Sequence, residues 1–247
     1  MTVSKRETIK AQRTRKKRQQ RMNTLLWVGG FILLLVIIFI SPSIYNALKP
    51  AGDFVTITPV PYQFVDGKTV GDPNAKVKII VYEDFQCPAC KVFSQTVGKQ
   101  LLTSNYINNG LVYYTFKQFP FLDSQSIAKE SHQAANASMC AFEQSRFWDY
   151  HDMLFENQGV VENGGSFNDK RLLAFAESIG LDMNAFNDCF NANKYSADIE
   201  AEYLTAVNGG VNRTPTILIN EANPFSTYVP TYDEFIAAID AALAANE

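Results

Sequence analysis

Residues 77–90 read VKIIVYEDFQCPAC, and this stretch decides the fold. Its first six residues, VKIIVY, are almost continuously apolar, which is typical of a short β-strand buried on both faces. The strand runs into Cys87-Pro88-Ala89-Cys90, two cysteines separated by two residues. Proline suits the first turn of a helix, because no backbone amide hydrogen is needed there. The sequence therefore predicts a buried strand followed by a helix that begins at the cysteine pair.

This position favours thiol chemistry at the two cysteines. At a helix N-terminus, unpaired backbone N–H groups and the helix dipole stabilise a thiolate, so we expect the pKa of Cys87 to lie below the free value of about 8.5. Cys90 lies three residues further on and shares a helix face with Cys87, so it can attack a mixed disulfide formed there. We therefore predict that Cys87 and Cys90 are catalytic and that Cys87 is accessible to solvent.

Two other interpretations of the cysteine pair are open. It could form half of a structural zinc site, but the sequence contains no second closely spaced pair of ligands. It could also be a purely structural disulfide, although closing so short a loop stabilises a fold very little. Neither interpretation is favoured, and the sequence predicts no metal and no cofactor.

The segments around this stretch complete an α/β pattern. Residues 111–116 (LVYYTF) and 216–219 (TILI) are rich in β-formers, and about 100 residues of helical character separate them. Helix starts are expected at Asn168 and Asp182, and Thr231 begins a C-terminal helix with a capping box. This order predicts an α/β domain that carries a helical insertion at about residues 122–208.

The N-terminal part of the chain has a different character. Residues 1–21 carry nine Lys or Arg and one acidic residue, which leaves 13 of the 22 basic and 24 of the 25 acidic residues for the rest. So acidic a remainder offers no nucleic-acid surface. Residues 25–40 contain no charge, and extension to residue 44 gives about 30 Å of helix, the thickness of a bilayer core.

We therefore predict a basic cytoplasmic tail over 1–23 and a transmembrane anchor over 24–45. Basic residues before such a span are held on the cytoplasmic side, so the remainder lies outside the cytoplasm at the cell membrane. A signal peptide cleaved near Ser41-Pro42-Ser43 is the alternative. Residues 46–66 are expected to form a linker and a leading strand, and residues 67–247 the folded domain.

Three groups of residues resemble the DsbA-like thiol-disulfide oxidoreductases over about residues 67–245. They are DFQCPAC at 84–90, a helical stretch with CA at 140–141 and FWDYH at 147–151, and GVNRTPT at 210–216. The resemblance implies a thioredoxin fold with an inserted helical domain. It also implies that Pro215 is a cis-proline facing the cysteine pair, with the backbone of Thr214 exposed to pair with an extended substrate chain beside Cys87.

The same resemblance implies an activity and partners. The expected function is the introduction of disulfide bonds into exported proteins through the Cys-Pro-Ala-Cys site, with reduced exported proteins as substrates. The expected redox partner is a quinone-coupled membrane oxidase of the DsbB or VKOR type. A reductase or isomerase of the same fold remains an alternative, as does a peptide-binding or chaperone module without redox turnover.

One position departs from the family. Many members carry a buried, proton-relaying acid six residues before the first cysteine, where this chain has Val81. Glu83 shares the strand face of Val81, so it either replaces that acid or is a solvated carboxylate near the strand end. Asp84 matches a family acid, or simply caps the turn.

The residues between the cysteines bear on the Cys87 pKa. Pro88 and Ala89 stand where the strongest oxidants of the family have a thiolate-stabilising histidine. We therefore expect the pKa of Cys87 to be less depressed than about 3.5, the value of the most acidic example.

Cys140 and Cys189 remain outside the motif. Exported cysteines seldom stay free, and the motif accounts for the other two, so a structural disulfide between Cys140 and Cys189 is predicted. Some family members similarly have a second disulfide in the helical insertion. Two buried free thiols are the alternative.

Overall fold

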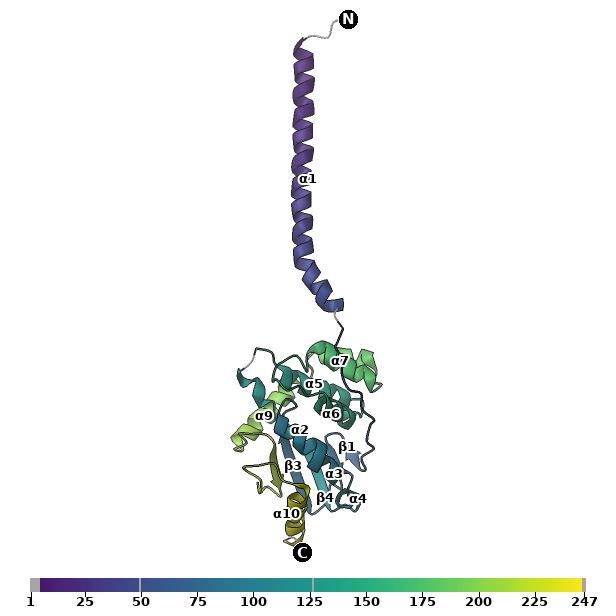
Figure 1. Ribbon diagram of the computed structural model, residues 1–247, viewed down its shortest axis with the longest axis vertical. Coiled ribbons are helices and arrows are strands. Elements are labelled where there is room, and N and C mark those ends of the chain that lie inside the picture. The colour runs from purple at the N-terminus through teal and green to yellow at the C-terminus, as the bar shows by residue number, and fades with distance from the viewer. Residues whose placement is uncertain (1–4, 49, 126, 246–247) are drawn as a thin grey trace. The chain divides into compact units, whose positions relative to one another are not determined.

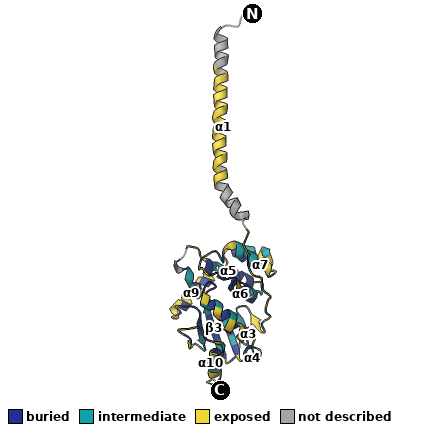
Figure 2. Cartoon of the chain, in the orientation of Figure 1, coloured by how far each residue is buried: buried dark blue, intermediate teal, exposed yellow. Residues whose placement is uncertain are grey.

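The computed structural model describes residues 5–48, 50–125 and 127–245, apart from the side chains at 5–12, 14, 36, 39–48 and 124–125. The chain divides into two compact units, residues 1–50 and residues 51–247. Figure 1 shows the elements of each unit, and Figure 2 shows how far each residue is buried.

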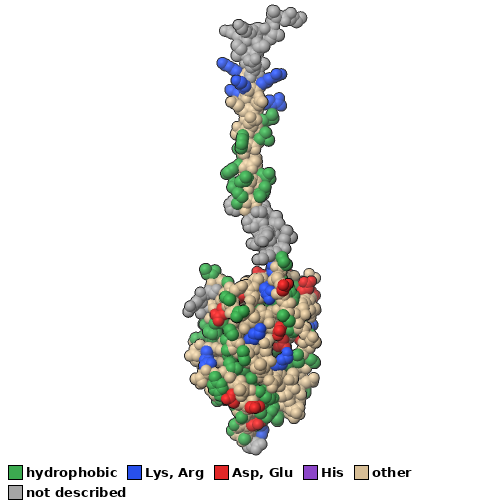
Figure 3. All heavy atoms as spheres, in the orientation of Figure 1, with side chains coloured by type: hydrophobic (Ala, Val, Ile, Leu, Met, Phe, Trp, Pro, Cys, Tyr) green, Lys and Arg blue, Asp and Glu red, His purple; other side chains and the backbone are tan. Residues whose placement is uncertain are grey.

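The first unit contains one helix, α1 (Lys5–Leu48). Figure 3 shows Lys and Arg side chains in its N-terminal part and hydrophobic side chains further along. The described apolar side chains between Leu25 and Ile38 are exposed. Among the described residues, no helix combines the length and apolar character needed to span a membrane. The anchor predicted over 24–45 includes positions 36 and 39–45, whose side chains lie outside the description.

A mixed β-sheet forms the centre of the second unit. In the described residues its strand order is β1-β2-β4-β3-β5. The central strands β3 and β4 are parallel, whereas β2 runs antiparallel to β4 and β5 antiparallel to β3. The strands are β1 (Val65–Asp66), β2 (Thr69–Gly71), β3 (Val77–Glu83), β4 (Val112–Gln118) and β5 (Thr216–Ile219).

Strand β3 has the buried character that its sequence predicts. Val77, Ile79, Val81 and Glu83 are fully buried on one face, and the alternate residues are half-buried on the other. The strand ends one residue later than expected, so Glu83 is its last residue. The motif of residues 84–90 therefore leaves the sheet at its centre.

Helices cover this sheet and form the insertion between β4 and β5, which confirms the α/β fold with a helical insertion. Between β3 and β4 lie α2 (Pro88–Phe93), a π-helical turn η1 (Ser94–Gly98), α3 (Lys99–Leu102) and α4 (Asn105–Asn108). The insertion comprises the 3₁₀ turn η2 (Phe121–Gln125), α5 (Glu130–Phe142), α6 (Phe147–Glu156), α7 (Asp169–Ser178), α8 (Met183–Asn191) and α9 (Ser196–Asn208). Helix α10 (Tyr232–Ala244) follows β5.

The expected helix starts are confirmed by their caps. The Asn168 side chain accepts a hydrogen bond from a backbone amide in the first turn of α7, and Asp182 does the same for α8. At α10 both halves of the Thr231–Glu234 capping box are present. Such caps satisfy amides that the helix itself leaves unpaired.

The segment expected to be a linker packs on the helical insertion. The backbone of Val55 exchanges two hydrogen bonds with the Asn157 side chain, at 2.7 and 2.8 Å. The ring of Phe54 lies edge-on to Phe175, and a second aromatic pair joins Tyr62 to Trp148. We call residues 53–62 the N-terminal arm. The arm belongs to the second unit because side-chain hydrogen bonds and ring contacts hold it there.

Candidate active site

The two cysteines of the motif lie at the start of α2. Cys87 is the N-cap residue, Pro88 is the first helical residue, and the Lys91 amide donates to the Cys87 carbonyl at 3.1 Å. Both thiols are free. Cys87 keeps 7% of its surface exposed, and Cys90 has none. Both residues are therefore buried, contrary to the accessibility predicted for Cys87, although Cys87 is the less deeply buried of the two.

The surroundings of Cys87 favour its thiolate. The largest influence on the pKa of Cys87 is a hydrogen bond from the Cys90 thiol, which lowers it. Burial comes next and raises the pKa. Hydrogen bonds from Thr214 and from the backbone amides of Cys90 and Ala89 lower it further. Together they lower the pKa of Cys87 to about 6. A large fraction of Cys87 is thus ionised at neutral pH, as expected for a thiol at a helix N-terminus.

Cys90 has the opposite character. Its complete burial raises the pKa of its thiol well above the ordinary value, and the neighbouring Cys87 and Glu83 add to that effect. The site therefore pairs one acidic thiol that keeps slight exposure with one completely buried thiol that holds its proton.

The loop before β5 faces the motif. Thr214 and Pro215 are joined by a cis peptide bond, and the Cys87 Sγ donates a weak hydrogen bond to the Thr214 carbonyl at 3.6 Å. The Thr214 hydroxyl is buried and has no hydrogen-bond partner among the described residues. The structure thus brings together all four residues that the sequence singles out as catalytic.

Asp84 holds the turn between β3 and α2. Its carboxylate accepts hydrogen bonds from the Gln86 amide at 2.8 Å, the Leu122 amide at 3.0 Å and the Ser131 hydroxyl at 2.6 Å. Burial raises the pKa of Asp84 to about 7, although these hydrogen bonds oppose the shift. Asp84 therefore caps the turn and also fastens it to the helical insertion.

Glu83 is completely buried, which excludes the solvated alternative left open by the sequence. Neither carboxylate oxygen has a hydrogen-bond partner among the described residues, and Oε2 lies 3.8 Å from Nε2 of His151. Burial raises the pKa of Glu83, and the His151 imidazole partly counteracts it. The charge of Glu83 raises the pKa of the Cys90 thiol, and the charge of Cys87 raises the pKa of Glu83.

A disulfide joins Cys140 in α5 to Cys189 in α8, with a sulfur–sulfur distance of 2.03 Å. The structure thus contains the pairing that the sequence predicts for these cysteines rather than two free thiols. The bond links two helices of the insertion and contributes no group to the Cys87–Cys90 site.

A protein-family model described as Thioredoxin matches residues 64–241. The chain belongs to this thioredoxin family. The match covers the sheet, the cysteine motif, the helical insertion and most of α10.

The curated relatives of this thioredoxin-family protein include proteins of two kinds. A Na⁺/H⁺ antiporter NhaA 1 of Salinispora arenicola is 29% identical over 70% of the chain, which spans 24% of the antiporter's length. The probable disulfide bond formation protein D of Bacillus cereus is 26% identical over 89% of the chain and 97% of its own length. The chain therefore spans about a quarter of the antiporter but nearly all of the second relative.

Solved structures of other proteins resemble the second unit of this chain in fold. BdbD of Bacillus subtilis in its oxidised form superimposes with a TM-score of 0.63 at 23% identity, covering 78% of this chain and all of that one. Oxidised Mtb DsbA gives a TM-score of 0.56 at 27% identity, covering 74% of this chain and 100% of that one. These structures show that the chain has the fold of BdbD and of Mtb DsbA.

Several contacts of the site are absent from the sequence-based prediction. Gln158, in the loop after α6, donates to the carbonyls of Phe85 and Cys87 at 2.7 and 3.0 Å. His151 packs among aromatic rings, and it also lies against Glu83. The only local signal for His151 is its place in the FWDYH segment.

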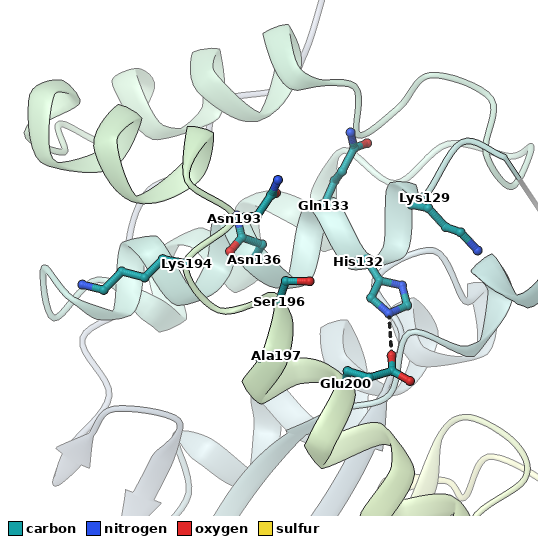
Figure 4. A pocket seen from close by; sticks show the side chains of 9 residues that line it. All are labelled: Lys129, His132, Gln133, Asn136, Asn193, Lys194, Ser196, Ala197 and Glu200. Carbon is teal, nitrogen blue, oxygen red and sulfur yellow. Dashed lines mark hydrogen bonds and ion pairs between the residues drawn. The ribbon is translucent and has the colours of Figure 1, made fainter.

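A cavity of about 830 Å³ in this thioredoxin-family domain lies elsewhere (Figure 4). It opens between α5 and the start of α9, and neither motif cysteine lines it. His132 points toward Glu200, 3.5 Å away, and its other ring nitrogen lies 2.9 Å from Asp123. The cysteine chemistry therefore takes place outside this cavity.

Proposed function

We propose that the protein is an extracytoplasmic oxidase that introduces disulfide bonds into exported proteins through Cys87-Pro88-Ala89-Cys90. The observation that carries this proposal is the contrast between the two thiols. The pKa of Cys87 is lowered to about 6, and Cys90 is buried and retains its proton. Relatives named for disulfide bond formation, matched over nearly their whole length, add support.

The reaction begins with the Cys87–Cys90 disulfide. A substrate thiolate attacks the Cys87 sulfur, the internal bond breaks, and Cys90 leaves with the electron pair and takes up a proton. The substrate's second thiolate then attacks its own sulfur in the mixed disulfide, and Cys87 leaves as a thiolate. Two electrons pass from the substrate to the protein. The lowered pKa of Cys87 makes it a good leaving group, which favours this direction.

The loop at Thr214 supports binding of an extended substrate. Its carbonyl lies within 3.6 Å of the Cys87 sulfur, so a chain pairing with this backbone would place its cysteine beside Cys87. For reoxidation we propose a quinone-coupled membrane oxidase of the DsbB or VKOR type.

The proposed location rests on the sequence of the first unit. Nine basic residues precede an uncharged apolar stretch at 25–40, which supports a cytoplasmic tail and a single membrane anchor. Protease added outside intact spheroplasts should then digest the domain while the fragment containing residues 1–45 stays in the membrane fraction. Full protection of the domain would contradict this location.

The decisive experiment for the function is the reduction potential of the cysteine pair, measured by equilibration with glutathione. A reduction potential of about −120 mV, that of DsbA, supports the oxidase, and one of about −270 mV, that of thioredoxin, favours a reductase. A Cys87→Ser variant is the matched control, since it should lose all redox turnover. If the protein's activity toward exported proteins is unchanged in the Cys87→Ser variant, that activity does not need the cysteine pair, and a peptide-binding module is indicated instead.

A further inference from the structure

We propose that His151 and Asp152 conduct protons between solvent and the buried pair formed by Glu83 and Cys90. The proposal rests on the proposed function, because only turnover of the cysteine pair creates a need for these protons. It assigns a role to two residues of α6, an element of the helical insertion.

The chemistry requires such a route. When the Cys87–Cys90 disulfide opens, the Cys90 sulfur must gain a proton, and when the disulfide reforms, Cys90 must lose that proton before it attacks Cys87. Cys90 has no exposed surface, so bulk water cannot exchange the proton with it directly. A buried group has to carry the proton inward or outward at each turnover.

Glu83 is the buried group that can exchange this proton with Cys90. It is buried, its two oxygens have no hydrogen-bond partner among the described residues, and its charge acts on the thiol of Cys90. The titratable groups that act on it or feel its charge are Cys87 at the N-cap of α2, Cys90 in α2, Tyr114 in β4 and His151 in α6. Glu83 itself is sealed from solvent and therefore needs a second carrier.

His151 provides the next step. Its Nε2 lies 3.8 Å from Glu83 Oε2 and 3.4 Å from the Ser94 hydroxyl, while its Nδ1 lies 2.9 Å from Asp152 Oδ1. The two ring nitrogens thus face the inside and the outside of the domain, so the imidazole can gain a proton on one and release it from the other. The ring of Phe116 lies edge-on at 5.3 Å and helps to exclude water.

Asp152 forms the outer end of the route. Its side chain is 16% exposed and borders a cavity of about 40 Å³ that Ser94 and Lys99 also line. A space of this size can hold a water molecule. The Tyr62 hydroxyl donates a hydrogen bond to Asp152 Oδ2 at 3.2 Å, and the Lys99 Nζ lies 4.0 Å from the same oxygen.

The electrostatics of the imidazole agree with this geometry. Burial lowers the pKa of His151, but its contacts with Asp152 and Glu83 outweigh burial, so the pKa lies above the ordinary value. A buried imidazole that still accepts a proton near neutral pH can serve as a carrier rather than only as a packed ring.

The test separates the two steps by which the reduced full-length protein reacts with oxidised glutathione. In the first step the Cys87 thiolate attacks glutathione disulfide and releases one glutathione. In the second step Cys90 loses its proton and attacks Cys87, and the second glutathione leaves as a thiolate. Acid quenching and mass spectrometry distinguish the dithiol, the mixed disulfide and the internal disulfide, so each rate can be followed from pH 5 to pH 9.

We expect His151→Gln to slow the second step about tenfold at pH 7 and to shift its pH profile, with the first step unchanged within about twofold. Asp152→Asn should slow the second step about threefold. His132→Gln replaces the chain's other histidine and should change neither step. A merely structural role of His151 would alter both steps or neither.

The possible results are distinguishable. A folded His151→Gln protein with a wild-type second step overturns the proposal. If circular dichroism shows that this variant does not fold, Asp152→Asn decides, and a wild-type second step in that variant overturns it as well. If the wild-type protein forms no mixed disulfide at all, the oxidoreductase function itself fails, which is a different outcome from loss of the second step alone.

Discussion

Thr214 shows how one hydroxyl acts on the reactive sulfur. In the dithiol form its Oγ1 is buried and has no hydrogen-bond partner among the described residues, while its own carbonyl accepts a weak hydrogen bond from the Cys87 thiol. When Cys87 ionises, this hydroxyl is a donor available to the new negative charge, and its interaction lowers the pKa of Cys87. The residue before Pro215 thus tunes the thiolate as well as offering backbone to a substrate.

Replacing this hydroxyl should make Cys87 less acidic. The rate of iodoacetamide alkylation of the wild-type protein should show an inflection near pH 6. In Thr214→Val the inflection should rise by about one unit, because a hydrogen bond to a charged group contributes about 1.5 kcal/mol. Thr216→Val is the matched control, since the Thr216 hydroxyl bonds the Arg213 carbonyl instead. Identical inflections for Thr214→Val and the wild type would disprove the role.

At the level of elements, the turn between β3 and α2 depends on the helical insertion. The Asp84 carboxylate binds the amide of Leu122 in η2 and the hydroxyl of Ser131 in α5, and the Gln86 side chain also donates to Ser131 at 2.8 Å. The insertion therefore positions the residues that lead into the cysteine motif.

Asp84 should make folding stability depend on pH. Its folded-state pKa of about 7 lies above the unfolded value of about 3.9, so the folded protein binds the proton more tightly. The stabilisation from this proton is complete below about pH 4 and is lost as the pH rises through 7. From pH 5 to pH 8 the wild type should therefore lose about 2.5 kcal/mol of unfolding free energy that Asp84→Asn does not lose.

Urea unfolding of the oxidised proteins at the two pH values measures this difference. Asp188→Asn, at an exposed position of α8, is the control and should show no such difference. A pH-independent difference between Asp84→Asn and the wild type would show that Asp84 does not titrate in this range.

The same elements show what the sequence could and could not predict. Strand β3 and the caps at Asn168 and Thr231 follow from local patterns, because neighbouring residues determine them. The burial of Glu83 does not, because strand parity assigns a side chain to a face without showing what covers that face. The partner that covers it, His151, is 68 positions further along the chain, and only the folding of the insertion over the sheet brings the two together.

At the scale of the whole molecule, one covalent bond ties the insertion together. The Cys140–Cys189 bond joins residues 49 positions apart. Closing a loop of that length restricts the unfolded chain and stabilises the fold by about 4 kcal/mol on the chain-entropy model. The bond is thus a large contribution for a protein of ordinary stability.

This contribution can be measured without changing the insertion itself. In a Cys87→Ala/Cys90→Ala background, a reductant breaks only the Cys140–Cys189 bond, so the same sequence is compared with and without it. Urea unfolding should show a loss of about 4 kcal/mol on reduction. Equal unfolding free energies for the two forms would refute the stabilising role.

The N-terminal arm also matters to anyone who prepares a shortened form of the protein for crystallisation. A polypeptide starting at Gly67 would retain strands β2 to β5 and the cysteine motif, but it would lose β1 and uncover the faces of Trp148 and Phe175 on which Tyr62 and Phe54 pack. Bare aromatic surface of this kind promotes aggregation. Truncation should therefore stop at Ala51, even though the family match begins only at residue 64.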